Sequence, residues 1–284
     1  MKWQGRRRSD NVEDRRGVSG RGLAVGGGVG GLIIVALFLL LGGNPDEITQ
    51  SLQTGGLSSP AETGRPLSEK DKVMGDFVSV ILADTEDVWG TVFAEGGQSY
   101  RKPRLVLFTD QVQSACGFAG AATGPFYCPG DERVYLDLGF FDEMQRRLGA
   151  PGDFAMAYVV AHEVGHHVQT LLGIMDQVMS QRGRVSEREF NQLLVRLELQ
   201  ADFLAGVWAH YARSVSGYLE EGDIEEGLNA ASAVGDDRIQ RQSQGYVVPD
   251  AFTHGTSEQR VRWFRKGLET GDINQGDTFS ARIL

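Results

Sequence analysis

The chain has 284 residues, of which 41% are hydrophobic, enough for one large globular domain or two small ones, and a formal net charge of −10. The first 21 residues carry seven basic and three acidic side chains, which leaves 21 basic and 35 acidic residues in the remainder. Because residues 22–284 are so acidic, we expect neither nucleic acid nor an anionic membrane surface as a partner.

The N-terminal region predicts a membrane anchor. An uncharged run follows the basic segment, and residues 23–43 within it are long enough to cross the hydrocarbon core of a bilayer as a helix. The basic flank favours a cytoplasmic tail at residues 1–22, with the rest of the chain across the membrane. A cleaved signal peptide is the alternative, but residues 40–45 contain no Ala-x-Ala cleavage site. We therefore expect a single-pass membrane protein whose tail and anchor lie outside the core of an extracytoplasmic domain.

Residues 44–67 are rich in Gly, Ser, Pro and Thr without a period, which is typical of a linker. The domain itself is expected over residues 68–284. It begins with a helix whose apolar spacing runs from a capping sequence at Ser68 to about Glu95. Two strands follow, a buried one at residues 105–109 and an alternating one at residues 133–138.

The only cysteines, Cys116 and Cys128, lie in the Gly- and Pro-rich loop between these strands. In an oxidising exported domain they would form one disulfide, and a buried reduced pair is the alternative. They are too few, and too far from any histidine, to form a zinc site of their own.

The helix predicted over residues 153–172 carries the motif His162-Glu-Val-Gly-His166. Both imidazoles leave the same face because one helical turn separates them, so they can bind one metal ion with Glu163 beside its open side. The pattern also occurs by chance, and a helix with two polar residues is the simpler alternative. Residues 154–161 are almost wholly apolar, however, so these histidines would enter from a buried helix, where unpaired polar groups are costly. We predict a zinc site.

A second helix supplies the third ligand in this prediction. A capping box at Ser186 and Glu189 opens a helix that continues to about Ser214 and carries Glu198 and Asp202 one turn apart. Catalytic zinc needs three protein ligands and one open position, and Glu198 can complete that set. Asp202 is expected to accept the outer ring N–H of a ligand histidine, most simply that of His162.

The loop that holds the cysteines and the strand next to it, if they lie beside the zinc helix, could form a sheet edge that pairs with an extended peptide. Ordinary sheet packing is an equal alternative.

The C-terminal part is predicted to contain one helix over residues 223–244, with a solvated charge run at residues 236–241. A further helix begins with a capping box at Thr256 and Gln259. His254 lies just ahead of it and is the candidate donor to a reaction oxyanion.

Three other side chains are further candidates for the site. Tyr246 is a weaker candidate than His254 for stabilising the oxyanion. His167 is turned about 100° from His166 on the helix, so it is expected to pack or to support a ligand rather than bind metal. His210 lies two turns beyond Asp202 and is assigned the same way.

Four segments carry a family resemblance: residues 3–16, 162–169, 198–202 and 254–260. Together they resemble the bacterial neutral zinc metallopeptidases of the YpfJ-like type, over nearly the whole chain. The resemblance implies a gluzincin-type Zn²⁺ site of two histidines and a glutamate, with an aspartate four residues further on. It also implies peptide hydrolysis, with a peptide or protein as the substrate.

The expected fold class is therefore α+β: a mostly helical, zincin-like domain with a small sheet, preceded by one transmembrane helix. The expected function is that of a membrane-anchored zinc endopeptidase with Glu163 as general base. The alternative is a membrane-tethered binding or scaffold protein that keeps zinc for stability and does not cleave. Glu163 favours the enzyme, because a structural zinc site does not need a base beside an open position.

Overall fold

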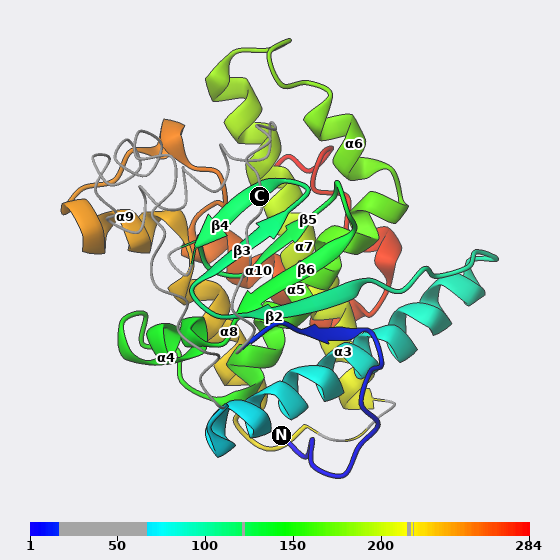
Figure 1. Ribbon diagram of the computed structural model, residues 1–284. Helices are drawn as coiled ribbons and strands as arrows, with labels where there is room; N and C mark the ends of the chain where they lie inside the picture. Colours follow the sequence, from blue (N-terminus) through cyan, green and yellow to red (C-terminus); the bar gives the residue numbers. More distant parts are fainter. Residues whose placement is uncertain (17–66, 121–122, 215–216, 218) are drawn as a thin grey trace.

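The computed structural model describes residues 1–16, 67–120, 123–214, 217 and 219–284 (Figure 1). The predicted anchor at residues 23–43 lies outside these ranges, as does nearly all of the predicted linker at residues 44–67. Among the helices within these ranges, none is both long and apolar enough to cross a membrane.

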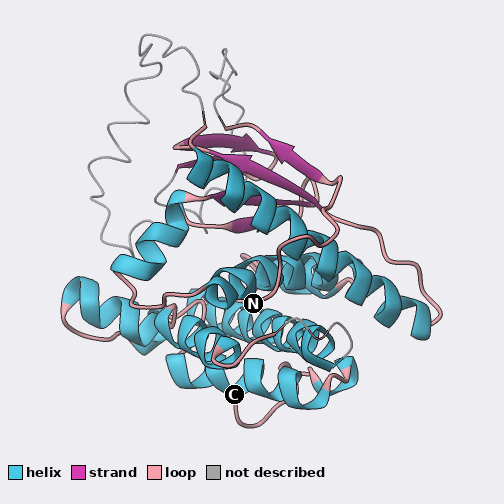
Figure 2. Cartoon of the chain, turned by 90° about the horizontal axis from the view of Figure 1, so that it is seen from below, coloured by secondary structure: helices cyan, strands magenta, loops and turns pink. Residues whose placement is uncertain are grey.

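A four-stranded sheet lies against one side of a layer of helices (Figure 2). Its order is β1 (Val12–Asp14), β2 (Arg104–Phe108), β6 (Arg133–Asp137) and β5 (Phe126–Cys128). The first three strands run parallel, and β5 is antiparallel to β6. The strands predicted at residues 105–109 and 133–138 are confirmed as central neighbours in this sheet.

Side chains alternate across β2 and β6, so each face of the sheet has its own apolar cluster. Leu105 and Leu107 pack with the helices, whereas Val106 and Phe108 point to the other face. That second face is covered by a hairpin of β3 (Gln111–Ser114) and β4 (Gly117–Gly120). The loop predicted between the two long strands therefore contains three short strands, β3, β4 and β5.

The rest of the described chain is mainly helical, which confirms the α+β expectation. The capping boxes predicted at Ser68 and Thr256 are both present. The helices are α3 (Glu69–Glu95), α4 (Gly139–Arg146), α5 (Asp153–Leu171), α6 (Ile174–Met179), α7 (Glu187–Ser214), α8 (Asp223–Ala233), α9 (Asp236–Gln244) and α10 (Ser257–Thr270), with short 3₁₀ turns η2 (Pro249–Ala251) and η3 (Ile273–Gln275).

Helices α5 and α7 approach closely at Gly165. A Cβ added to this glycine would lie 3.0 Å from the carbonyl oxygen of Ala201, closer than side-chain contacts normally allow. The small residue therefore lets the two backbones pack directly together. This contact sets the face of α7 that carries Glu198 opposite the face of α5 that carries the two histidines.

The prediction of a single helix over residues 223–244 is wrong. This segment breaks at Val234 and Gly235 into α8 and α9. Gly235 packs directly against Ser257, where an added Cβ would lie 2.4 Å from the backbone nitrogen. The solvated face expected for residues 236–241 is also wrong for Asp236, whose side chain is buried.

The expectation that the first 43 residues lie outside the core is wrong for residues 1–16. β1 is an edge strand of the sheet, and Figure 1 shows it in blue beside β2 and close to α3. The side chain of Met1 is buried in the main core, and the ring of Trp3 lies 5.4 Å from that of Phe77 on α3. Three of the basic residues that suggested a cytoplasmic tail, Arg6, Arg7 and Arg8, instead find carboxylate partners on α3.

Candidate metal centre

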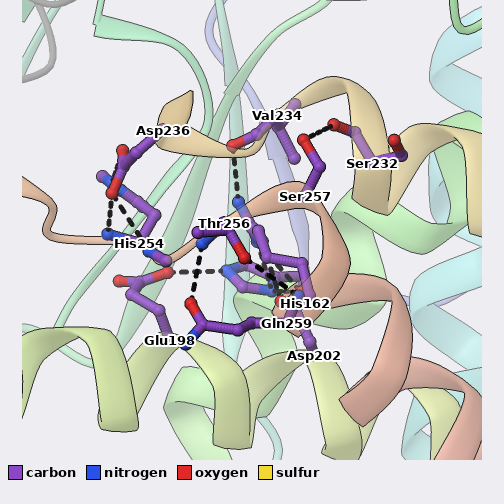
Figure 3. Close-up of polar contacts among 12 residues, drawn as sticks. His162, Glu198, Asp202, Ser232, Val234, Asp236, His254, Thr256, Ser257 and Gln259 are labelled. Carbon is purple, nitrogen blue, oxygen red and sulfur yellow. Dashed lines mark hydrogen bonds and ion pairs between the residues drawn. The ribbon is translucent and has the colours of Figure 1, made fainter. Parts of the chain in front are cut away.

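Two histidines of α5 and one glutamate of α7 converge on a single point. The Nε2 atom of His162 lies 3.1 Å from Glu198 Oε2, and that of His166 lies 3.5 Å from Glu198 Oε1. The three residues offer ligand atoms that all lie within 4.8 Å of one another. Figure 3 shows the imidazole of His162 facing the Glu198 carboxylate. The structure thus brings together the three residues predicted to bind zinc.

The outer nitrogens of both imidazoles are held by acceptor groups. Nδ1 of His162 lies 2.9 Å from Asp202 Oδ1, and Nδ1 of His166 lies 2.8 Å from Gln169 Oε1. A carboxylate or an amide oxygen only accepts hydrogen bonds, so each Nδ1 carries the proton in the neutral ring. Each Nε2 therefore directs a lone pair to the common centre. Two such nitrogens and a carboxylate are a donor set that fits zinc.

Asp202 is clamped by two further residues that sequence reasoning missed. Arg260 on α10 donates to both of its oxygens, at 2.7 and 2.9 Å, and Tyr158 on α5 donates to Oδ1 at 2.5 Å. Arg260 also donates to the carbonyl oxygen of Val234, at the break between α8 and α9. Charge-assisted bidentate pairs of this kind fix orientation as well as adding energy. The clamp ties His162 to three helices.

The support of His166 is neutral and was also missed. The side-chain amide of Gln169 donates to the carbonyl oxygen of Leu197 at 2.7 Å and to Gln200 Oε1 at 3.1 Å. Gln200 in turn donates to the carbonyl oxygen of Gly276 near the C-terminus, at 3.0 Å. A relay of two amides therefore connects His166 with α7 and the C-terminal residues.

The electrostatics of the metal-free site are those of a buried cation and anion pair. Burial alone would raise the pKa of Glu198, but the charges of His166 and His254 and the hydrogen bonds of the ring nitrogens hold it well below its usual range. Burial lowers the pKa of His162, and the carboxylates of Asp202 and Glu198 outweigh it and raise this pKa to about 10. The centre thus favours a positive charge at the point where the ligand atoms meet.

Glu163 is buried next to these ligands. Burial raises the pKa of its carboxyl, whereas the charges of His162 and His166 lower it in part. A carboxyl with a raised pKa beside a metal site is suited to exchange a proton, so its position agrees with the predicted general base.

His254 is held at the entrance to α10 by a buried carboxylate. Asp236 Oδ2 accepts from the backbone N–H groups of Thr253, His254 and Gly255, at 2.8, 2.6 and 3.0 Å. Its other oxygen, Oδ1, lies 3.3 Å from Nδ1 of the His254 ring. The ring is largely buried, which lowers its pKa, but the charges of Glu198 and Asp236 raise it overall. Figure 3 shows His254 and Glu198 close together.

The remaining candidates lie elsewhere. The side chain of Tyr246 is 62% exposed, and nothing in the described structure fixes it toward the metal centre. His167 is fully buried and joins α5 to β5, with its ring nitrogens 2.6 Å from the carbonyl oxygen of Arg101 and 3.1 Å from the hydroxyl of Tyr127. His210 lies 2.9 Å from the carbonyl oxygen of Leu268. Both histidines therefore lie outside the group of described residues that could hold the zinc ion, and their ring nitrogens contact other groups.

The predicted disulfide between Cys116 and Cys128 is present. It ties the turn between β3 and β4 to the end of β5, the strand that contacts α5. The disulfide and the contact of Tyr127 with His167 therefore fix β5, at the edge of the sheet, relative to the metal-binding helix.

A second group of acidic residues, Asp153, Asp223 and Glu226, could also hold an ion by its geometry. The amino group of Met1 already lies 3.0 Å from both oxygens of Asp153 and 3.3 Å from Asp223 Oδ1. A set of carboxylates alone suits hard cations rather than zinc. It does not compete with the histidine site.

Comparisons with known proteins give a consistent result. A family model described as "Putative neutral zinc metallopeptidase" matches residues 1–279. An uncharacterized protein of Escherichia coli strain K12, YpfJ, is 50% identical over 290 residues, covering 100% of both chains. An uncharacterized protein of Mycobacterium tuberculosis strain H37Rv, Rv2575, is 47% identical over 195 residues, covering 65% of each. No solved structure gives a significant match.

Proposed function

The chain belongs to the neutral zinc metallopeptidase family, and we propose that it is a zinc-dependent endopeptidase whose metal ligands are His162, His166 and Glu198. One observation carries this proposal. The inward nitrogens and the carboxylate meet at one point, while both outward nitrogens are already engaged by acceptors. Because each Nδ1 already has an acceptor, the Nε2 atoms are the ring nitrogens that remain, and only an ion or a proton at the centre can satisfy them.

Zinc in such a site lowers the pKa of a coordinated water towards neutrality and polarises the substrate carbonyl. The protein's own contribution begins with Glu163, which takes a proton from the attacking water and returns it to the leaving amine. Its raised pKa suits both steps, because the same carboxyl must accept a proton and then release it.

His254 is proposed to donate a hydrogen bond to the carbonyl oxygen as that atom gains negative charge. Asp236 supports this role because it fixes both the loop and the ring. A protonated ring is favoured by the raised pKa of His254. Asp202 would then act only through His162, by holding the ring in the tautomer that binds metal.

The edge of β5 is proposed to bind the substrate backbone. This strand ends the sheet as far as the structure describes it, and His167 and the disulfide fix its place beside α5. Pairing with an extended peptide uses hydrogen bonds to main-chain groups rather than to side chains, so this edge would bind peptides of many sequences.

A non-cleaving scaffold that keeps zinc for stability remains the alternative. The position of Glu163 argues against it, since burying a carboxyl beside the ligands is costly and a purely structural ion gains nothing from it.

The test compares variants of the full-length chain, because residues 1–16 are part of the fold. Zinc content and casein cleavage are measured for wild type, Glu163→Gln and Glu198→Ala. Glu187→Gln, an exposed change on the same helix as Glu198, is the matched control. We expect wild type and the control to bind zinc and cleave, Glu163→Gln to bind zinc without cleaving, and Glu198→Ala to lose both.

Two outcomes would overturn parts of the proposal. Equal zinc binding by wild type and Glu163→Gln with no cleavage by either would favour the scaffold. Full zinc occupancy in Glu198→Ala would remove this residue from the ligand set.

A further inference from the structure

Residues 1–16, here called the N-terminal segment, are integrated into the domain by backbone hydrogen bonds. β1 pairs with β2 in parallel register, with Val12 opposite Leu105 and Asp14 opposite Leu107. The amide of Leu105 donates to the carbonyl oxygen of Asn11 at 2.9 Å, and that of Ser9 donates to Ser79 on α3 at 3.0 Å. The segment therefore completes the sheet and is bound to α3 as well.

The arginines of the segment are engaged in ion pairs. Arg7 pairs with Glu86 and Asp87 on α3, and Arg8 pairs with Asp76 on the same helix. Arg16 is buried and donates to the carbonyl oxygen of Asp71 at 2.7 Å. These contacts give the arginines of the segment partners within the protein.

Glu86 shows that the domain depends on the segment. Its carboxylate is 2% exposed and accepts from Ser9 Oγ at 2.5 Å, Asn11 Nδ2 at 2.7 Å and Arg7. Removing the segment would leave Lys102 as the remaining described ion-pair partner of this buried carboxylate. Losing the partners of a buried charge is strongly destabilising, so we take the docked state as the native one.

This docking has a topological consequence. The segment precedes the uncharged run at residues 22–43 and the domain follows it, yet the two share one sheet. A single membrane crossing between them would place them on opposite sides of the bilayer, where they cannot pair. We propose that residues 1–16 and residues 67–284 lie in the same compartment, so the uncharged run does not separate them. This replaces the expected arrangement of a cytoplasmic tail and an extracytoplasmic domain, and it does not depend on the proposed peptidase activity.

The test places one exposed cysteine in each part of the full-length chain, Gln4→Cys in the segment and Glu187→Cys in the domain. Cells that express each variant are treated with a membrane-impermeant maleimide, and labelling is expressed as a fraction of that after detergent lysis. Wild type measures the background, since its two cysteines form the disulfide. We expect equal fractions for the two positions, both high or both low. A high fraction at one position with a low fraction at the other would overturn the proposal.

A second measurement tests the docking itself. Glu13 and Val106 are register partners in β1 and β2, and neighbouring strands bring Cα atoms to a distance that a disulfide can span. Purified full-length Glu13→Cys/Val106→Cys should form an additional disulfide under mild oxidation, seen as faster migration on a non-reducing gel. Glu13→Cys/Ser186→Cys, with the second cysteine at the start of α7, should not. Equal cross-linking of both pairs, or of neither, would contradict a docked segment.

Discussion

The two ligand histidines sit in the same helix, one turn apart, but the protein holds them in different ways. His162 is oriented by the carboxylate of Asp202, which Arg260 and Tyr158 clamp from α10 and α5. His166 is oriented by the neutral amide of Gln169. We call these two supports the charged arm and the amide arm.

The difference shows where the site concentrates its electrostatic energy. In the charged arm an anion and a cation are both buried. Removing one of them leaves the other as an unpaired charge in a poorly solvating environment. In the amide arm, removing a partner leaves only neutral groups unpaired, which costs less. The charged arm should therefore govern both stability and metal affinity, and substitutions in each arm should differ in both quantities.

The largest effect is expected for Asp202→Asn. This change leaves Arg260 buried without its counter-charge, so we expect a loss of about 3–5 kcal/mol in the free energy of unfolding. The ring of His162 also loses its orienting carboxylate, which should weaken zinc binding about 10- to 100-fold. Chemical denaturation of the metal-free protein and a chelator competition assay measure the two quantities separately.

The double variant Asp202→Asn/Arg260→Met is its control. Removing the stranded charge should restore much of the stability, but not the zinc affinity, because the carboxylate is still missing. If Asp202→Asn alone kept wild-type zinc affinity, the charged arm would have no role in metal binding.

A smaller effect is expected from pH, because the carboxylate of Asp202 is kept. In the metal-free protein burial lowers the pKa of His162, but Asp202 and Glu198 raise it to about 10. The ordinary pKa of a histidine in the unfolded chain is about 6.5. A higher pKa in the folded state contributes stability that is fully present below about pH 6.5. This contribution is lost as the pH rises towards 10. We expect the metal-free wild type to lose stability over this range.

Urea unfolding of the metal-free protein at several pH values between 6 and 10 measures this loss. The double variant Asp202→Asn/Arg260→Met should show a shallower fall, because the carboxylate that raises the pKa of His162 is absent. An equal fall in both proteins would mean that the pH dependence arises outside the charged arm.

The parts of this site that could be predicted from the sequence are those with a local signal. The spacing of His162 and His166, and the capping sequences at Ser186 and Thr256, depend on residues within one or two helical turns. The clamp and the amide relay have no such signal. Arg260 meets Asp202 across 58 positions, and Gln169 meets Gln200 across 31. Only the packing of α5, α7 and α10 brings these partners together.

The fold shows the same limit. Long, periodic segments such as α3 and α7 were predicted, whereas the short strands β1, β3, β4 and β5 were not. β1 was missed because basic residues that precede an apolar run are typical of a cytoplasmic flank. Nothing local shows that Arg6, Arg7 and Arg8 pair with carboxylates on α3. The break between α8 and α9 was missed because it depends on a contact of Gly235 with Ser257.

In the amide arm, Gln169→Leu should have an intermediate effect. The ring of His166 loses its acceptor, and the backbone carbonyl oxygen of Leu197 and the side-chain amide oxygen of Gln200 each lose a donor. We expect about 1–3 kcal/mol of destabilisation and a loss of zinc affinity near the lower, roughly tenfold, end of the range for outer partners of metal ligands. The same denaturation and chelator assays apply, with the exposed Gln177→Leu as control. A loss of zinc affinity greater than that of Asp202→Asn would reverse the ranking of the two arms.

The smallest effect is expected for Tyr158→Phe, which separates charge from hydrogen-bond number within the charged arm. The variant removes one donor to Asp202 Oδ1 and the hydroxyl that accepts from Arg260 at 3.3 Å. It leaves both bonds from Arg260 to Asp202 and the contact of Asp202 with His162. The ring can keep its edge contact with Phe264, whose centroid is 5.2 Å away. We therefore expect a cost of about 0.5–1.5 kcal/mol, mainly that of the short bond to Asp202, because the 3.3 Å bond from Arg260 is long and adds little. Zinc affinity should fall by less than about tenfold, below the usual range for outer partners.

Tyr135→Phe is the matched control, since its hydroxyl donates to Asp131 near the hairpin side of the sheet, away from the metal centre. It should leave zinc affinity unchanged. If Tyr158→Phe weakened zinc binding as much as Asp202→Asn does, the orientation of Asp202 would depend on the full set of its donors. The bidentate pair with Arg260 would then be insufficient to hold the carboxylate against His162, and the advantage of the charged arm would come from its network of hydrogen bonds rather than from its charge.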